Sequence, residues 1–268
     1  MFVREKVIKA ILDSGENFMS GEQLSKKLGI SRTAVWKHIN ALREEGYNIE
    51  SVNKKGYRLA EKPDDILSSE NIAYNLPTEF IGKKVIHLDT VGSTNDYAKE
   101  IGNKVSGGTL IISEQQTKGK GRLGRVWKSK SGDGIWMSLI IKPKIEPYKA
   151  PFLTLVAGAS VVKALSNLGV EASIKWPNDI IVHNKKICGI LTELSAEMER
   201  VNYVVIGIGI NIKTTDFPDE IKEKATSLYK EGYKLSRVDI VRHFCIEFEK
   251  LYKGYILAGN KQDTLELC

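Results

Sequence analysis

A short polar segment that contains a proline, residues 61–65, divides the sequence into two parts with different hydrophobic patterns. Before it, apolar residues recur at helical spacing; beyond it, helical runs are mixed with short runs typical of strands. A chain of 268 residues is long enough for about two domains. We therefore predict a first domain at residues 1–62, a linker and the start of a second domain at 63–83, the main domain at 84–257 and a short tail at 258–268.

The first part carries the pattern of three helices. Residues 4–14 place apolar side chains on one helical face. Ser20 caps a second helix, with Gln23 at the position that completes a capping box, and Gly29 ends this helix. Ser31 caps the third helix only a short turn further on. Two short helices joined by such a tight turn predict a helix-turn-helix.

Two strand-like runs, residues 49–52 and 57–59, follow the third helix and flank a basic hairpin tip. The exposed side chains at the start of that helix are hydrogen-bonding or cationic, as contacts to bases and phosphates require. This combination predicts a winged helix-turn-helix that binds DNA; the solvated face of a protein-interaction module is the alternative. The predicted DNA contacts are Arg32, Thr33, Trp36, Lys37, Lys54 and Lys55.

The charge balance favours a polyanionic partner. The chain carries 40 Lys and Arg against 33 Asp and Glu, a net charge of +7, and residues 1–62 hold 12 basic and 8 acidic side chains. The three cysteines lack metal-ligand spacing, which excludes a cysteine-based zinc cluster or a disulfide scaffold and fits a reducing compartment. We find no secretory signal and no apolar run of about 20 residues, so we predict a cytoplasmic protein without a membrane segment.

Beyond residue 83, helices and strands do not alternate regularly, and hairpins are present. Regular alternation would indicate a doubly wound parallel sheet. We therefore predict an α+β domain with a mixed, largely antiparallel sheet. The expected helices are 94–101, 151–168 and one capped by Ser236, and the expected strands are 84–88, 109–113, 134–141, 173–175, 180–183, 187–194 and 203–212.

Residues 118–125 join three glycines to four cations. Glycines leave backbone amides open to a close ligand and cations attract an anion, so the segment predicts a cradle for a phosphate-bearing ligand. It is neither a P-loop nor a dinucleotide fingerprint, because the glycine spacing and the flanking residues differ. A flexible basic hairpin loop is the alternative. Trp127, just after it, either offers a flat face to a base or fills the core.

Three further segments carry polar residues or glycines beside or within the predicted strands. In residues 175–179 a Trp-Pro pair fixes an extended backbone before Asn178 and Asp179, which otherwise serve as turn residues. Residues 92–96 form a helix cap, and the amides at a helix start also favour anions. Glycines within the strand-like run 207–212 mark a place where another group approaches the backbone closely.

These motifs together resemble those of a known family, the bifunctional biotin protein ligases that also repress a biotin operon. Residues 119–125, GKGRLGR, resemble the adenylate-binding loop GRGRxGR of that family. Residues 175–179 are similar to its KWPND signature, and residues 93–95 to its STN motif. The resemblance covers essentially residues 1–257, and three motifs in this order behind a winged helix make it specific.

The resemblance implies an ATP-dependent enzyme that forms biotinyl-5′-adenylate and passes biotin to a lysine of a biotin carboxyl carrier protein. It also implies operator DNA as a partner, homodimers favoured by the adenylate, and Mg²⁺ bridging the phosphates. Lys186 and Arg122 are the expected catalytic cations, and Asp179 is our candidate base for the acceptor lysine. The implied biotin-binding residues are Ser93, Thr94, Asn95, Gln116, Lys120, Gly121, Arg122 and Lys186. Those implied for ATP or the adenylate are Gly119, Arg125, Trp127, Asn178 and Asn211.

Two features depart from the family pattern. Lys120 stands where the family loop usually has arginine, and lysine lacks the two parallel donors of a guanidinium, so we expect weaker retention of the adenylate. The chain stops at Cys268, where the family normally adds a small β-barrel domain, and both a natural short form and a truncated product stay open. Two other functions are considered: a DNA-binding regulator that senses biotin or its adenylate with little ligase activity, and a related lipoate-type ligase.

Overall fold

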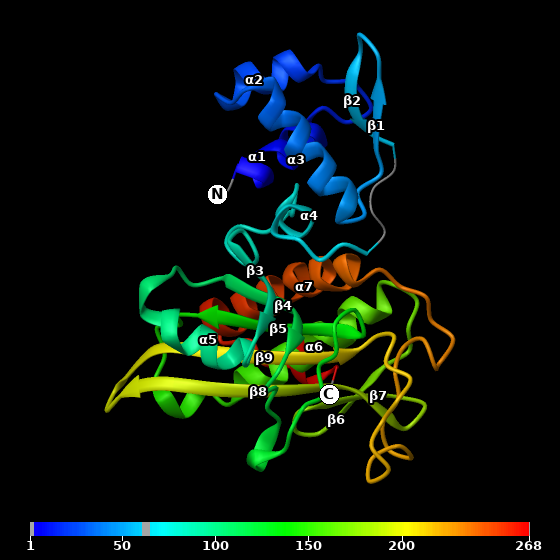
Figure 1. Cartoon of the computed structure of the whole chain (residues 1–268). Coiled ribbons are helices and arrows are strands. Elements are labelled where there is room, and N and C mark those ends of the chain that lie inside the picture. Colours follow the sequence, from blue (N-terminus) through cyan, green and yellow to red (C-terminus); the bar gives the residue numbers. More distant parts are fainter. Residues whose placement is uncertain (1–2, 61–64, 268) are drawn as a thin grey trace. The chain divides into compact units, whose positions relative to one another are not determined.

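The computed structural model describes residues 3–60 and 65–267, which divide into two compact units between Tyr74 and Asn75 (Figure 1). The predicted linker residues 61–64 lie outside the described residues. The division falls later than residue 62 because the segment before Tyr74 packs on the core of the first unit. Ile66 and Tyr74 both contact that core, and the Tyr74 hydroxyl donates to the Leu12 carbonyl oxygen at 2.9 Å.

The first unit is a bundle of three helices with a two-stranded hairpin. Its elements are α1 (Val3–Asp13), α2 (Gly21–Leu28), α3 (Arg32–Glu44), the antiparallel strands β1 (Ile49–Val52) and β2 (Gly56–Leu59), and the short helix α4 (Ser69–Ala73). Ser20 and Gln23 form the predicted capping box, Gly29 ends α2 with a φ of 66°, and Ser31 caps α3. The predicted helix-turn-helix and its hairpin are confirmed; α4 was not predicted, because five residues show no periodicity.

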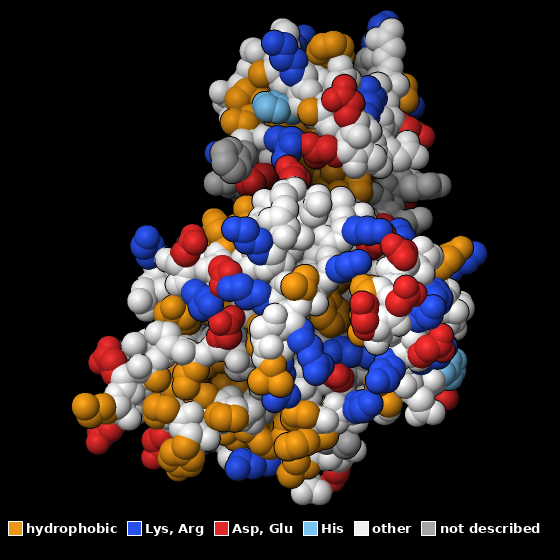
Figure 2. All heavy atoms as spheres, turned by 60° about the horizontal axis from the view of Figure 1, so that its bottom comes forward, with side chains coloured by type: hydrophobic (Ala, Val, Ile, Leu, Met, Phe, Trp, Pro, Cys, Tyr) orange, Lys and Arg blue, Asp and Glu red, His pale blue; other side chains and the backbone are white. Residues whose placement is uncertain are grey.

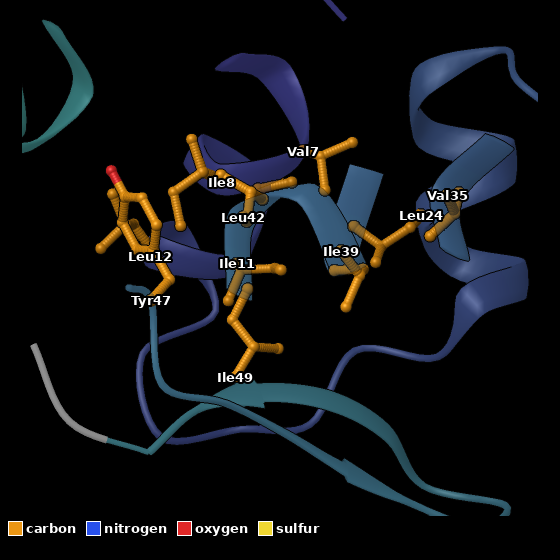
Figure 3. Close-up of a cluster of buried hydrophobic side chains, with 11 residues drawn as sticks. Val7, Ile8, Ile11, Leu12, Leu24, Val35, Ile39, Leu42, Tyr47 and Ile49 are labelled. Carbon is orange, nitrogen blue, oxygen red and sulfur yellow. The ribbon is translucent and has the colours of Figure 1, made fainter. Parts of the chain in front are cut away.

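Apolar side chains from the three helices and from β1 meet in one core (Figure 3). Val7 and Ile11 of α1 lie in it with Leu24 of α2 and Ile39 of α3, and all four are fully buried. These residues come from the helix faces that the apolar spacing predicted. Because the core takes the face of α3 that carries Ile39, the neighbouring Trp36 stays 54% exposed.

A seven-stranded mixed sheet forms the second unit. Its strands are β3 (Val85–Val91), β4 (Thr109–Gln116), β5 (Gly134–Ile141), β6 (Ser173–Lys175), β7 (Asp179–Val182), β8 (Lys185–Glu197) and β9 (Arg200–Asn211), in the spatial order β3-β4-β5-β9-β8-β7-β6. Strands β3 and β4 pair in parallel, and every other described pair in this sheet is antiparallel. This arrangement confirms the predicted α+β class.

Helices cover both faces of this sheet (Figure 1). They are α5 (Thr94–Ile101), α6 (Phe152–Ser166), α7 (Arg237–Ala258) and α8 (Gln262–Leu265). Helix α5 lies on one face, where Ala98 packs with Ile111 of β4 and Val205 of β9. Helices α6 and α7 lie on the other face, and Thr154 of α6 donates to Thr192 Oγ1 of β8 at 2.8 Å. The pocket described below lies on the face that carries α5.

The segment Pro147–Ser166 corrects one expectation. By length and composition alone it is apolar enough to cross a membrane, although the sequence led us to expect no such run. In the structure, 61% of its most apolar window is buried inside the second unit. Helix α6 within it is therefore a core helix of the domain, and its apolar character serves packing against the sheet.

One buried carboxylate joins α7 to the chain ahead of β3. Glu249 accepts hydrogen bonds from the backbone amides of Glu79, Phe80 and Ile81 at 2.7, 2.9 and 3.0 Å. Lys253 lies 3.3 Å from the same carboxylate. Burial raises the pKa of Glu249, but the three amides and Lys253 outweigh burial and hold this pKa below the ordinary 4.5.

We expect Glu249→Gln to lower the free energy of unfolding at pH 7 by about 1.5–3 kcal/mol, the range for hydrogen bonds to a charged acceptor. Because the folded-state pKa lies below the unfolded-state value, this stabilisation is present above pH 4.5 and is lost as the pH falls through the folded-state pKa. Urea unfolding of both proteins over that pH range measures the difference. Glu199→Gln, at an exposed hairpin position, is the control. A difference that persists undiminished in acid would contradict the assignment.

Candidate active site

A pocket opens on the face of the sheet that carries α5. It holds about 470 Å³ of space, part of it open to solvent. Its walls come from the start of α5, the end of β4, the loop that follows β4, and strands β5, β8 and β9. Of the residues predicted for the site, those that line it are Ser93, Thr94, Asn95, Gln116, Lys120, Gly121, Arg122, Trp127, Asn178 and Lys186. Three motifs far apart in the sequence therefore border one cavity.

One row of residues across the sheet forms part of the pocket floor. Gly189 of β8 pairs with Gly209 of β9, and Gly209 pairs with Trp136 of β5. The ring of Trp127 lies on the two glycines: a Cβ on Gly209 would be 2.6 Å from Trp127 Nε1, and one on Gly189 would be 2.8 Å from Trp127 Cζ3. Since residues in one row point to the same face of a sheet, glycine at both positions is what makes room for the ring.

The next row of the floor carries Asn95. Ser138 of β5 pairs with Gly207 of β9, and a Cβ on Gly207 would be 2.2 Å from Asn95 Oδ1. Ser138 Oγ donates to this Oδ1 at 2.6 Å, and Asn95 Nδ2 donates to Glu193 Oε2 at 2.8 Å. The buried amide of Asn95 is thus satisfied at both ends, and it holds the start of α5 directly on the sheet.

The end of β4 closes the wall beside α5. Gln116 Oε1 accepts a hydrogen bond from the Thr94 amide at 2.8 Å, and Gln116 Nε2 donates to Ser129 Oγ at 2.9 Å. Ser93 Oγ accepts from the Asp96 amide and caps α5, as the sequence predicted. Hydroxyl and amide groups therefore supply both donors and acceptors along this wall.

Two cations reach the pocket from the basic loop, which we define as residues 119–126. Lys120 Nζ lies 2.6 Å from Asp96 Oδ2 and 2.9 Å from Asp96 Oδ1. Arg122 Nη1 donates to Asn178 Oδ1 at 2.6 Å, which places the KWPND segment beside the loop. Figure 2 shows Lys and Arg side chains mixed with Asp and Glu side chains on one face of the second unit. An anionic ligand would meet a positive surface at this pocket.

Lys186 supplies the third cation, from the start of β8. Its Nζ lies 2.7 Å from Asp179 Oδ1 and 5.3 Å from the centre of the Trp127 ring. Its backbone is fixed on both sides: the Lys186 amide donates to Lys224 O at 2.8 Å, and the Thr226 amide donates to Lys186 O at 2.9 Å. Two backbone hydrogen bonds and an ion pair therefore set the position of this ammonium group.

Four predicted site residues lie outside the pocket lining. Gly119 packs beneath Trp127, where a Cβ would be 2.3 Å from the Trp127 carbonyl oxygen. Arg125 is exposed. Asp179 forms an ion pair with Lys186, which does line the pocket. Asn211 Nδ2 donates a hydrogen bond to Thr226 O at 3.1 Å. The structure brings the other members of the predicted site together.

Sequence reasoning did not single out Ser138, Gly189 or Glu193. Ser138 and Glu193 stand alone within long apolar strands, and no local signal marks them. Gly189 offered the same signal as the glycines of 207–212, since it also lies inside a strand-like run. Its partner Gly209 became evident only from the strand register.

Among the described residues, we find neither a cysteine nucleophile nor a metal-binding cluster at the pocket. Cys188 lies next to Gly189, and burial raises the pKa of its thiol, so the thiolate needed of a nucleophile is not formed. Within residues 3–60 and 65–267, no group of three or more His, Cys, Asp or Glu side chains is placed to hold a metal ion.

On the first unit, each of the predicted DNA-contacting residues is exposed. Arg32 pairs with Glu22 at 2.5 Å at the start of α3. Lys55, at the hairpin, lies 5.9 Å from the centre of the Phe18 ring. The residues exposed there are Arg32, Thr33, Trp36, Lys37, Lys54 and Lys55.

Comparison with known proteins gives matches in both units. Residues 88–211 match the biotin/lipoate A/B protein ligase family, and residues 3–58 match an HTH domain. The bifunctional ligase/repressor BirA of Bacillus spizizenii is 47% identical over 262 residues, which are 96% of this chain and 80% of that protein. BirA of Escherichia coli is 35% identical over 230 residues, 85% of this chain and 70% of that protein.

A solved structure agrees with these matches. The biotin protein ligase of Aquifex aeolicus, in complex with biotin and ATP, is 36% identical with a TM-score of 0.57, covering 65% of this chain and 72% of that chain. The fold of the second unit thus matches a solved biotin protein ligase, and the helix-turn-helix matches an HTH domain. The chain belongs to the biotin/lipoate A/B protein ligase family, among its bifunctional ligase/repressors.

We expect Gly209→Ala to push the Trp127 ring off the pocket floor, because the new Cβ would lie 2.6 Å from two atoms of the ring. Overpacking of this kind lowers the free energy of unfolding by about 1–3 kcal/mol. Urea unfolding measures this loss, and a red shift of tryptophan emission reports the exposed indole. Gly254→Ala on α7, whose Cβ meets nothing within 4 Å, is the control. Unchanged stability with an unchanged spectrum would contradict this packing.

Proposed function

We propose that this chain is an ATP-dependent biotin protein ligase and also a biotin-responsive transcriptional repressor. The observation that carries the proposal is the convergence of the GKGRLGR loop, the STN helix start and Lys186 on one pocket. The chain that forms this pocket is 47% identical to a bifunctional ligase/repressor over most of its length. The ligase of Aquifex aeolicus was solved with biotin and ATP, and we propose both as substrates here.

In the first half-reaction, a carboxylate oxygen of biotin attacks the α-phosphorus of ATP, the bond to the bridging oxygen breaks, and pyrophosphate leaves. Both reactants are anions, so fixed cations are needed to bring them together and to stabilise the charge on the phosphoryl oxygens. Lys186 and Arg122 are proposed for this role, because both side chains line the pocket. Arg125, exposed in the same loop, is proposed to contact the adenylate when the loop is closed.

The polar wall suits the ureido ring of biotin, which has two N–H donors and one carbonyl acceptor. We propose that Ser93, Thr94, Asn95 and Gln116 bind this ring, since hydroxyl and amide groups offer both kinds of partner. Lys120 and Gly121 would cover the bound vitamin from the basic loop. The adenylate residues proposed are Gly119, Arg125, Trp127, Asn178 and Asn211, with the Trp127 ring as the platform for adenine.

In the second half-reaction, the amine of a carrier lysine attacks the biotinyl carbonyl carbon, the anhydride C–O bond breaks, and AMP leaves. The attacking amine must lose a proton to form the amide. Asp179 is the proposed proton acceptor, because its carboxylate lies 2.7 Å from Lys186 at the pocket edge. The proposed carrier is a biotin carboxyl carrier protein.

Mg²⁺ is proposed to arrive with ATP. Mg²⁺ commonly keeps several waters and is held by substrate phosphates with one or two carboxylates. Asp179 is the predicted catalytic carboxylate nearest Lys186, and no cluster of three or more metal-ligating side chains was found among residues 3–60 and 65–267. The triphosphate would therefore hold the ion, which would supply neutralisation of the phosphate charge.

The first unit is proposed to bind operator DNA within a homodimer that the adenylate favours. Paired recognition helices read twofold sites, so we propose a palindromic operator. The proposed contacts are the six exposed residues of α3 and the hairpin. A cytoplasmic location is proposed, since ATP and DNA are both found there.

Two variants separate the half-reactions. Lys186→Gln removes a cation from the pocket, and we expect a loss of about 10²–10³-fold in the rate of adenylate formation, measured as pyrophosphate release.

Asp179→Asn is expected to slow the transfer of biotin from preformed adenylate to the carrier by about 10²-fold, measured in a single turnover. Lys185→Gln, at the exposed neighbouring position, is the control.

Each outcome has one meaning. Full transfer by Asp179→Asn would reject Asp179 as the base. Wild-type protein that binds biotin in calorimetry but forms neither adenylate nor labelled carrier would reject the ligase and support the biotin-sensing regulator. Displacement of biotin by lipoate at equal concentration would support a lipoate-type ligase instead.

We expect Lys37→Ala to weaken operator binding and to reduce the slope of log affinity against log salt by about 1, because one phosphate contact is lost. The operator is a fragment that the protein selects from random DNA, and fluorescence anisotropy at several salt concentrations measures the affinity. Lys9→Ala, exposed on α1, is the control. Equal affinity of the wild type and Lys37→Ala at every salt concentration would exclude α3 as the recognition helix.

A further inference from the structure

The basic loop, residues 119–126, has few attachments to the rest of the second unit. Residues 119–126 are all described, and two of their side chains bind to residues elsewhere in the unit. Lys120 forms an ion pair with Asp96, and Arg122 donates a hydrogen bond to Asn178. Its backbone hydrogen bonds run within the loop and to Trp127, such as the Gly121 amide to Arg125 O at 2.7 Å. The position of the loop over the pocket therefore depends on two contacts.

The contact to Asp96 is the charged one of the two. Lys120 Nζ lies within 2.9 Å of both carboxylate oxygens of Asp96. Asp96 stands in the first turn of α5, whose start is fixed to the sheet by the neighbouring Asn95. The carboxylate is thus a rigid anchor, whereas the lysine belongs to the loop.

Asp96 also forms an ion pair with a second cation. Lys99, one turn later on α5, lies 3.0 Å from Asp96 and 2.7 Å from Glu193. Burial raises the pKa of Asp96, but Lys120 and Lys99 outweigh burial and hold this pKa below its ordinary value. When Lys120 turns towards an anion in the pocket, Asp96 keeps Lys99 as a partner. The exchange of partners by Lys120 therefore leaves no carboxylate unpaired.

We infer that Asp96 is a positioning residue that holds Lys120, and with it the basic loop, over the pocket before the adenylate is formed. The inference rests on the proposed function, because it takes biotin to lie beneath the loop. Asp96 is outside the pocket lining and acts through Lys120. Its loss frees one of the two attachments of the loop, so biotin bound without ATP escapes sooner.

The test is the release of labelled biotin from the full chain after a chase with unlabelled biotin. We expect Asp96→Asn to raise the dissociation rate constant by about two- to five-fold, as the loss of an exposed ion pair allows. The association rate constant of biotin should change less than the dissociation rate constant, because biotin enters both proteins while the loop is open. Asp96→Glu, which keeps the charge, should restore the wild-type rate to within about two-fold. Glu100→Gln, an exposed carboxylate on the same helix, is the matched control.

A double-mutant cycle distinguishes positioning from a structural role. In a Lys120→Gln background, Asp96→Asn should have no further effect on biotin release, because the partner is already absent. Unaltered release by Asp96→Asn alone, or the same acceleration in both backgrounds, would overturn the inference. If Asp96→Asn does not fold, Asp96→Ser takes its place in the same cycle.

The two proposals fail in different ways. Wild-type protein that binds no biotin in calorimetry would reject the proposed function. Wild-type binding together with any of the contrary release rates would reject the role of Asp96 alone.

Discussion

Direct contact between side chains and the glycine backbone of two strands is the constraint on which the pocket depends. Gly207 and Gly209 lie two residues apart on β9, so both face the same side, and Gly189 of β8 pairs with Gly209. Asn95 and Trp127 rest on these positions with no side chain between them and the sheet. Glycine weakens a strand, but Ile206, Ile208 and Ile210 alternate with these glycines and are buried. Alternating residues thus supply apolar packing on one face of the strand and room for Asn95 and Trp127 on the other.

The cations of the site follow a common arrangement. Lys120, Arg122 and Lys186 each have an acceptor within the protein, and two of the three acceptors are carboxylates. Such partners reduce the repulsion among cations that border one small pocket, and each contact is exposed enough to be exchanged for a substrate anion. A site for two anionic reactants can in this way be preorganised without an unpaired buried charge.

Much of the fold could be predicted because its signals are local. The bounds of Thr94–Ile101, Gly134–Ile141 and Ser173–Lys175 agree with the expected helix and strands. Strand β8 extends beyond the predicted 187–194 to Lys185–Glu197, because its pairing with β9 continues after the apolar run has ended. Helix α8 escaped prediction since four residues show no periodicity. Helix α6, Phe152–Ser166, agrees with the helix expected at 151–168, and most of its apolar window is buried in the core.

The sequence by itself determined the helix-turn-helix and the three motifs of the candidate site, because caps, turns and signatures are encoded within a few neighbouring residues. It could not show that Gly189 would pair with Gly209, or that Asp96 would hold Lys120, because these residues are about twenty or more positions apart. Those pairs depend on the register between β8 and β9 and on the packing of α5 against the sheet. Only the tertiary structure decides these, because many strand pairings satisfy the same alternation of apolar residues, while one packed core selects among them.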